Sequence, residues 1–300
     1  MKMVTLSALV IVSTFSMPIA NAQEAPSIQT AAVAKIESHE PTFWQMFTNT
    51  PADLMDWWGL TFSRENAPQL IGTLGLTAAM IPTDYSTWMA VYRPTQDSAS
   101  LTKFFKGAEL WSSGLFQITS SALFLAWGAT GNTRALRTAY EIGESVLSSG
   151  VVVQLLKRAT GRESPRGSLV RGGQWRSYPG ESTYTSTLRN YDAMPSGHLS
   201  SAFVIFQVIE NNYPEQHWIS YAGYPLMGVF ALGCVGDNIH WFSDFPIAFA
   251  LGYSFAKIVT YRYHPELKVA DQKSNPYLPN FTMGFHEESD RPLLVANWHW

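Results

Sequence analysis

The chain has 300 residues, of which 46% are hydrophobic and 14% aromatic, which is enough for one sizeable core and makes a single domain the default. The formal net charge is -3, and the basic residues form no long stripe of the kind that neutralises nucleic-acid phosphates. We therefore expect no nucleic-acid partner.

The low content of charged residues bears on membrane contact. Charged residues make up 14% of the chain, below the ~25% usual in soluble domains, yet the mean hydropathy of -0.04 is low for a chain that crosses a bilayer many times. Residues 110–133 carry no charge and are long enough to span, and 218–236 are comparable apart from Pro225. The pattern favours a globular helical protein at or near a membrane over a six-pass one. It leaves membrane association and oligomeric state open.

The first 22 residues are predicted to be a signal peptide. Met-Lys is followed by an apolar run over 4–19 and by Ala20-Asn21-Ala22, which is a charged region, a hydrophobic region and a small-residue cleavage site. We therefore expect export to the periplasm or another extracytoplasmic face. Cys234 is the single cysteine, so no intramolecular disulfide can form and the fold must depend on packing.

Residues 23–41 are rich in Ala, Ser, Gln and Glu without periodicity and predict a flexible tail. Residues 42–265 predict one all-α domain, a bundle of about five or six core helices with the active site at one end. Its apolar helical segments are 101–127, 134–156, 196–209, 218–235 and 246–259. Residues 161–192 interrupt this pattern as a functional loop or lid. Residues 266–300 form a C-terminal extension, for which a hairpin and a packed terminal strand are both open.

Three polar clusters lie at the ends of these helical segments. Lys157 directly follows the helical segment 134–156, where its charge could simply complement the dipole of that helix. Ser196, Gly197 and His198 precede an apolar helix. Ser196 is a natural N-cap and Gly197 permits close backbone approach, so free N–H groups would face an anion. Ordinary capping beside a solvent-facing histidine would give the same pattern.

The third cluster is His240-Trp241-Phe242-Ser243-Asp244. If this segment is helical, the spacing of four places His240 and Asp244 on one face. An aspartate bonded to one ring nitrogen fixes the tautomer and leaves the other nitrogen as a better nucleophile. The alternative is a capping aspartate beside a surface histidine, because Pro246 marks a helix start at the same place.

Taken together, the order of Lys157, then Pro-Ser-Gly-His at 195–198, then His-x-x-x-Asp at 240–244 resembles the signature of the type 2 phosphatidic acid phosphatase and vanadium haloperoxidase superfamily. The resemblance covers residues 157–244 and, by helix pattern, 99–259. It implies a helical bundle that brings the three motifs to one end.

The resemblance also implies a role for each matching residue. His240 would attack phosphorus to form a phosphohistidine, Asp244 would orient His240, and His198 would protonate the leaving oxygen and later activate water. In addition, the equatorial oxygens of the phosphate would be held by a substrate-binding group that comprises Lys157, Ser196 and the Gly197 amide.

No metal or other cofactor is expected. Positioning and positive or N–H groups around three charged oxygens suffice for phosphoryl transfer, and His217, His264 and His286 are scattered singly rather than at metal-ligand spacing. The function expected is an exported, metal-independent phosphatase acting on a phosphate-ester substrate, either a soluble phosphomonoester or a lipid phosphate. The alternative is a catalytically degenerate member that binds phosphate or phospholipid without turnover.

Two departures from the family pattern affect the expected site. The family places arginines where this chain has Ser164 and Cys234, and losing one such donor commonly costs ~3 kcal/mol of transition-state stabilisation. The same absence weighs against a vanadate-dependent peroxidase. Six arginines between the first two motifs are candidates to compensate, with Arg162 first among them: Arg158, Arg162, Arg166, Arg171, Arg176 and Arg189.

Overall fold

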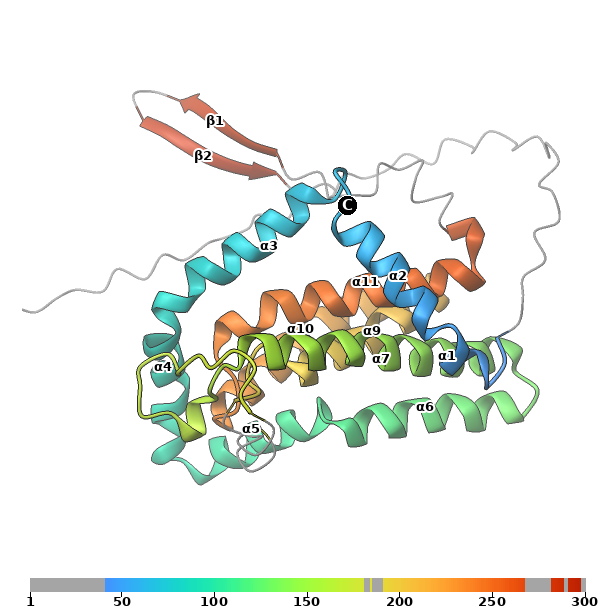
Figure 1. Ribbon diagram of the computed structural model, residues 1–300, viewed down its shortest axis with the longest axis horizontal. Coiled ribbons are helices and arrows are strands. Elements are labelled where there is room, and N and C mark those ends of the chain that lie inside the picture. The colour runs from blue at the N-terminus through green and yellow to red at the C-terminus, as the bar shows by residue number, and fades with distance from the viewer. Residues whose placement is uncertain (1–40, 181–183, 185–190, 268–281, 289–290, 298–300) are drawn as a thin grey trace, which may run out of the picture. The chain divides into compact units, whose positions relative to one another are not determined.

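The computed structural model describes residues 41–180, 184, 191–267, 282–288 and 291–297 (Figure 1). The predicted signal peptide, residues 23–40 of the predicted tail and Arg189 lie outside the described residues. The helices are α1 (Gln45–Thr48), α2 (Thr50–Thr61), α3 (Ala67–Met80), α4 (Asp84–Gln96), α5 (Ala99–Trp111), α6 (Gly114–Ala129), α7 (Thr133–Thr160), α9 (Gly197–Asn212), α10 (Trp218–Gly236) and α11 (Phe245–Tyr263). Three short 3-10 turns accompany them: η1 (Ile81–Thr83), η2 (Pro165–Gly167) and η3 (Phe242–Asp244).

The predicted all-α bundle is confirmed, and α5, α6, α7, α9, α10 and α11 form its core. Helix α9 packs against α7, α10 and α11, and α6 lies along α7 and α9, an arrangement that can be followed in Figure 1. Apolar side chains of α9, α10 and α11 make one buried cluster, which includes Phe203, Phe206, Phe230 and Phe245. These helices are apolar enough to be buried on several faces, so burial against neighbours stabilises them more than intrinsic propensity does.

The start and end of α7 fix where the first motif lies. The Asn132 side chain accepts a hydrogen bond from the Ala135 N–H and caps the N-terminus. At the other end Gly161 adopts the left-handed conformation, with φ of 49°, and a Cβ there would lie 1.7 Å from the Arg176 carbonyl oxygen. Only glycine fits this position. The chain therefore turns sharply just after Lys157 and directs Arg162 inward.

We expected one helical segment over residues 101–127. The structure instead has two helices there, α5 and α6, and the break between them also interrupts the uncharged segment 110–133. The hydroxyls of Ser112 and Ser113 donate to the carbonyl oxygens of Glu109 and Leu110, at 2.8 and 2.5 Å. Such local hydrogen bonds compete with helix continuation, and α5 ends at this point. Among the described residues, α10 is the one helix long and apolar enough to cross a membrane, and half of its apolar stretch is buried in the protein.

The C-terminal extension contains an antiparallel hairpin of β1 (Thr282–Glu288) and β2 (Arg291–Asn297) (Figure 1). Thr282 pairs with Asn297 at one end of the ladder and Glu288 pairs with Arg291 at the turn. Of the two alternatives that the sequence left open, the hairpin is the one observed.

Candidate active site

The three motif segments meet where four helix termini converge. The imidazoles of His198 and His240 lie 5.8 Å apart between ring centroids, with an interplanar angle of 71°. The Ser196 N–H donates to the Asp244 carbonyl oxygen at 3.1 Å, which joins the second motif to the third. The C-terminal turn of α7, the N-terminus of α9, the C-terminus of α10 and the N-terminus of α11 therefore border one site.

His240 is buried, with 3% of its surface exposed. Its Nδ1 lies 3.4 Å from Asp244 Oδ2, and Nδ1 has no well-formed hydrogen bond to any described residue. Burial lowers the pKa of His240 below its ordinary value, an effect that outweighs the opposing effect of Asp244. His240 is therefore neutral near neutral pH, and a neutral imidazole is the nucleophilic form.

Asp244 is held by neighbours other than His240. Its Oδ2 accepts the Trp241 backbone N–H at 2.8 Å, which closes the turn η3. Its Oδ1 accepts a hydrogen bond from Arg162 at 2.7 Å, and both side chains are fully buried. The two carboxylate oxygens of Asp244 are thus each held by a hydrogen bond that does not involve His240.

Lys157 and Gly197 lie next to each other. A Cβ at Gly197 would lie 3.7 Å from Lys157 Cε and 3.9 Å from Nζ. The ammonium donates to the Asp192 carbonyl oxygen at 2.6 Å and lies 3.4 Å from its carboxylate. Ser196 is the N-cap of α9, because its hydroxyl accepts from the Leu199 N–H at 3.3 Å. The Lys157 ammonium and the positive end of the α9 dipole therefore lie together, an arrangement that favours binding of an anion.

A comparison with known protein families gives a match that includes these residues. The family model described as PAP2 superfamily matches residues 138–268, which contain all three motifs. This region is a PAP2 superfamily domain. The match supports a phosphatase-like family for this region of the chain. No curated protein and no solved structure was found to match the chain.

Arg162 does not lie in the substrate-binding position that we expected. Its guanidinium is fully buried and donates to Asp84, Ser243, Asp244 and the Gly172 carbonyl oxygen. Three of these acceptors lie within the matched PAP2 region, and Asp84 lies outside it. The left-handed turn at the end of α7 directs the side chain into the protein, behind Asp244, so Arg162 does not provide the missing phosphate clamp.

Ser164 and Cys234, which replace the two family arginines, are both buried. The Cys234 thiol lies 3.6 Å from the Ser112 hydroxyl, and burial raises the pKa of Cys234 to about 12. The thiol is therefore protonated and unreactive at neutral pH. The Cys234 carbonyl oxygen accepts the N–H groups of Ile239 and His240, so the backbone here still positions the third motif.

The other arginines between the motifs differ in what they contact. Arg158, Arg171 and Arg176 each lie over a tyrosine ring. Arg166 instead forms an ion pair with Asp237 at 2.9 Å, and 45% of its side chain is exposed. Among these residues Arg166 is the one whose charge contributes to lowering the pKa of Glu109, a residue of the site described next. Its exposure and its electrostatic effect on Glu109 therefore make Arg166 the candidate among them.

Glu109 is a site residue that sequence reasoning missed. Its Oε1 lies 3.3 Å from His198 Nε2, and the hydrogen bond with His198 is the main cause that lowers the pKa of Glu109. Glu109 comes from α5, outside the matched region, and no motif marks it. The available signal was an acidic residue isolated in an apolar segment, Leu101–Trp127.

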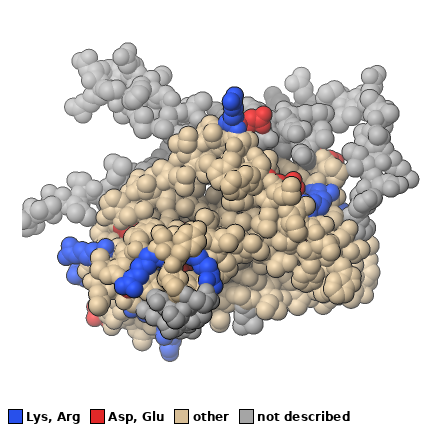
Figure 2. All heavy atoms as spheres, viewed as in Figure 1, with Lys and Arg blue, Asp and Glu red and all other residues tan. Residues whose placement is uncertain are grey.

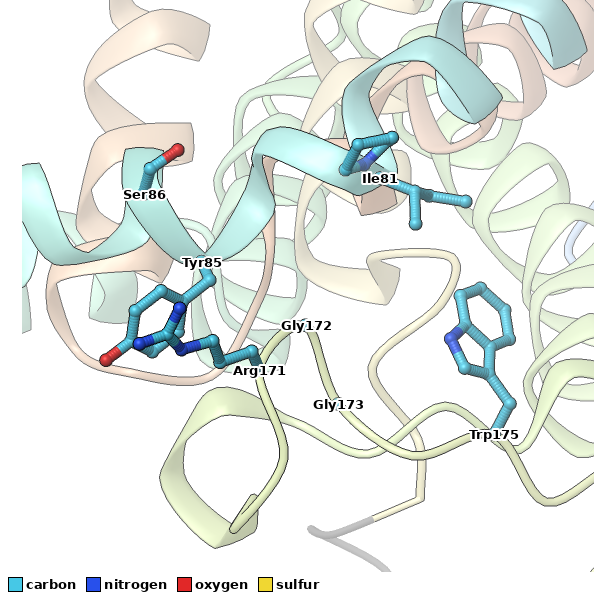
Figure 3. A pocket seen from close by; sticks show the side chains of 8 residues that line it. Ile81, Tyr85, Ser86, Arg171, Gly172, Gly173 and Trp175 are labelled. Carbon is cyan, nitrogen blue, oxygen red and sulfur yellow. The ribbon is translucent and has the colours of Figure 1, made fainter.

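A cavity of about 400 Å³ adjoins this site from the loop before the second motif (Figure 3). Its lining comprises Ile81, Pro82, Tyr85, Ser86, Arg171, Gly172, Gly173 and Trp175. Trp175 also stacks on Arg162, with 4.8 Å between the guanidinium carbon and the ring centroid. The histidines do not line this cavity. Across the part of the chain that the structure describes, no group of three His, Cys, Asp or Glu side chains is placed to hold a metal ion.

Proposed function

We propose that the protein is a metal-independent phosphatase that hydrolyses a phosphomonoester or lipid phosphate through a phosphohistidine on His240. The observation that carries this proposal is the approach of His198 and His240 to 5.8 Å between ring centroids. One buried neutral imidazole and one partly exposed imidazole, beside Lys157, match the nucleophile and the acid that phosphoryl transfer requires.

The reaction has two displacements. Nε2 of His240 attacks phosphorus, the bond between phosphorus and the ester oxygen breaks, and His198 gives a proton to that leaving oxygen. A water molecule then gives a proton to His198 and attacks phosphorus, and the nitrogen–phosphorus bond breaks to release phosphate. His198 is returned to its protonated form, so protons balance over the cycle.

The phosphate oxygens would be held by Lys157, by Ser196 and by the Gly197 N–H at the start of α9. When substrate binds, the Lys157 ammonium leaves Asp192 and contacts a phosphate oxygen instead. Arg166 takes the role that we first assigned to Arg162, because its guanidinium is exposed and it acts electrostatically on Glu109.

Glu109 supports His198 as Asp244 supports His240. A carboxylate that accepts one ring N–H fixes the ring orientation and favours a cationic ring that can donate a proton. Because the hydrogen bond with His198 lowers the pKa of Glu109 below its ordinary value, Glu109 is ionised near neutral pH.

The surface favours a lipid phosphate over a soluble ester. Helices α3, α6 and α10 carry no charged residue, and Figure 2 shows a face on which charged side chains are sparse. Large apolar residues are exposed on α3, α5 and α6, including Ile71, Leu74, Phe104, Leu110, Trp111, Ile118, Leu123 and Trp127. Trp111 and Trp127 bracket α6, as aromatic residues do at a membrane interface. We propose that this surface contacts lipid and that the protein is exported to an extracytoplasmic face.

The test is hydrolysis of p-nitrophenyl phosphate and of short-chain phosphatidic acid by the purified mature chain, with vanadate or EDTA added. We expect hydrolysis that vanadate inhibits and EDTA does not, with a higher kcat/KM for the lipid. His240→Ala should abolish hydrolysis, whereas the control His217→Ala, at an exposed position, should retain it. Turnover of neither substrate by the wild-type chain would contradict the proposal.

A second candidate function is binding of phosphate or phospholipid without turnover. The observation that favours it is the burial of Ser164 and Cys234 where the family has arginines. It predicts that phosphate protects the chain against thermal unfolding, that Lys157→Ala removes the protection, and that no substrate is hydrolysed.

A further inference from the structure

Asp84 lies outside the matched PAP2 region but enters the network behind His240. Asp84 begins α4 and is fully buried. Its Oδ1 accepts the Ser243 backbone N–H at 3.0 Å, and its Oδ2 accepts the Ser243 hydroxyl and an Arg162 N–H, both at 2.5 Å. A residue far from the motifs in sequence therefore fixes the turn that presents Asp244.

Arg162 connects this aspartate to the catalytic one. One terminal nitrogen of its guanidinium donates to Asp84, and the other donates to Asp244 Oδ1 at 2.7 Å and to the Ser243 hydroxyl at 2.6 Å. A planar guanidinium with donors in a fixed fork can hold two carboxylates at once, which a lysine ammonium does not reproduce. The result is a hydrogen-bonded path from Asp84 through Arg162 to Asp244, whose Oδ2 lies 3.4 Å from Nδ1 of His240.

The charges in this path do not cancel. Two carboxylates share one guanidinium, and all three side chains have 0% exposure, so the network carries a net charge of about -1 when both aspartates are ionised. If Asp84 were absent, Arg162 and Asp244 would form a neutral pair. The second carboxylate therefore leaves negative charge available to the imidazole of His240.

We propose that Asp84 and Arg162 are positioning residues that hold Asp244 against His240 and keep a net negative charge beside the ring as His240 becomes positively charged on phosphorylation. This inference rests on the proposed function for its catalytic consequence. Its geometric and electrostatic consequence, an effect of Asp84 on the titration of His240, does not depend on turnover.

The alternative is that Asp84 and Arg162 only tie α4 to the bundle. A structural tie would affect the temperature of unfolding but not the kcat of the folded fraction or the titration of His240. Asp84→Asn keeps the size of the side chain and one acceptor oxygen, and it removes the charge. It therefore separates the two explanations.

The experiment compares the wild-type chain with Asp84→Asn, each checked for folding by circular dichroism and thermal unfolding. We expect Asp84→Asn to lower kcat about tenfold, as loss of supporting partners does in other polar sites, with little change in KM. By NMR of ¹³C-labelled histidine, the midpoint for His240, assigned with His240→Ala, should move to lower pH. The control Glu215→Gln, in the exposed ion pair with Arg134, should change neither.

Two further variants cover the case in which Asp84→Asn does not fold. Ser243→Ala removes the hydroxyl that Asp84 and Arg162 share, and Arg162→Lys keeps the charge but not the fork. Both should lower kcat and alter the His240 titration. If folded variants match the wild-type chain in both measurements, the inference is overturned. If the wild-type chain shows no turnover but Asp84→Asn shifts the His240 titration, the proposed function fails and the positioning of His240 stands.

Discussion

Glu109 Oε1 lies 3.3 Å from Nε2 of His198, so the carboxylate on α5 faces the histidine at the start of α9. Glu109 therefore connects a helix outside the matched PAP2 region to the proposed acid. In the same way, Asp84 on α4 connects to the network behind His240. Glu109 thus contacts His198 directly, whereas Asp84 acts on His240 through Arg162 and Asp244.

Glu109→Gln should lower kcat, because the amide cannot stabilise a protonated His198 as a carboxylate does. We expect a loss of about 10- to 100-fold, greater for leaving groups that need a proton than for p-nitrophenol, which leaves readily without one. The measurement is kcat for an alkyl and an aryl phosphate. Equal losses for the two esters would contradict a role through His198.

The pH dependence of kcat/KM should show the ionisation of His240. Because burial lowers the pKa of His240, the ring stays neutral, and activity persists, below the ordinary histidine value of about 6.5. Asp244 opposes this shift, so Asp244→Asn should move the acidic limb to still lower pH while decreasing kcat. A limb that moves to higher pH in this variant would contradict the assignment.

Arg166→Ala should weaken transition-state binding if Arg166 has replaced the family arginines. We expect kcat/KM to fall about 100-fold, by analogy with the loss of one oxyanion donor. Arg171→Ala is the matched control, since Arg171 lies over Tyr85 beside the separate cavity. A loss no larger than that of the control would leave the two missing arginines without a replacement and would favour binding without turnover.

A buried polar cluster at α2, α7 and α11 predicts how stability depends on pH. Glu144 accepts hydrogen bonds from Arg262 and Tyr263. Asp53 forms an ion pair with the guanidinium of the same Arg262. Burial is the main cause that raises the pKa of Glu144 to about 7, with Asp53 adding to it. The folded chain thus binds a proton that the unfolded chain releases above pH 4.5, so this stabilisation is present below 4.5 and is lost as pH rises through 7.

The size of this effect is on the order of 3 kcal/mol of unfolding free energy between pH 4.5 and 8. Glu144→Gln mimics the protonated side chain and should flatten this part of the stability profile. The check is urea unfolding of both chains at pH 5 and pH 8. A wild-type profile that rises over this interval and matches that of Glu144→Gln would show that Glu144 is ionised throughout.

The fold could be predicted from the sequence because its signals are local. Apolar segments of helical length and a capping serine before α9 predicted the bundle, and the family resemblance carried by the three motifs implied which helix ends meet. The break between α5 and α6 was missed, because the hydroxyls of Ser112 and Ser113 that end α5 look like ordinary polar positions in an apolar run.

The surroundings of the candidate site could not be predicted, because they depend on contacts distant in sequence. Asp84 and Arg162 are 78 positions apart, and no local pattern relates them. Arg162 was assigned to substrate because it follows a glycine in the first motif, yet that glycine directs the side chain inward. The choice between Arg162 and Arg166 therefore required the geometry of the turn after α7.

The central claim is a covalent phosphohistidine on His240, and the most direct measurement is to trap it. The purified mature chain is mixed with a ³²P-labelled phosphatidic acid, quenched within milliseconds in alkali and digested, and the labelled peptide is identified by mass spectrometry. The account predicts an alkali-stable, acid-labile label on the peptide that contains His240, absent from His240→Ala. Label on another residue, or turnover by His240→Ala at the wild-type rate, would contradict it.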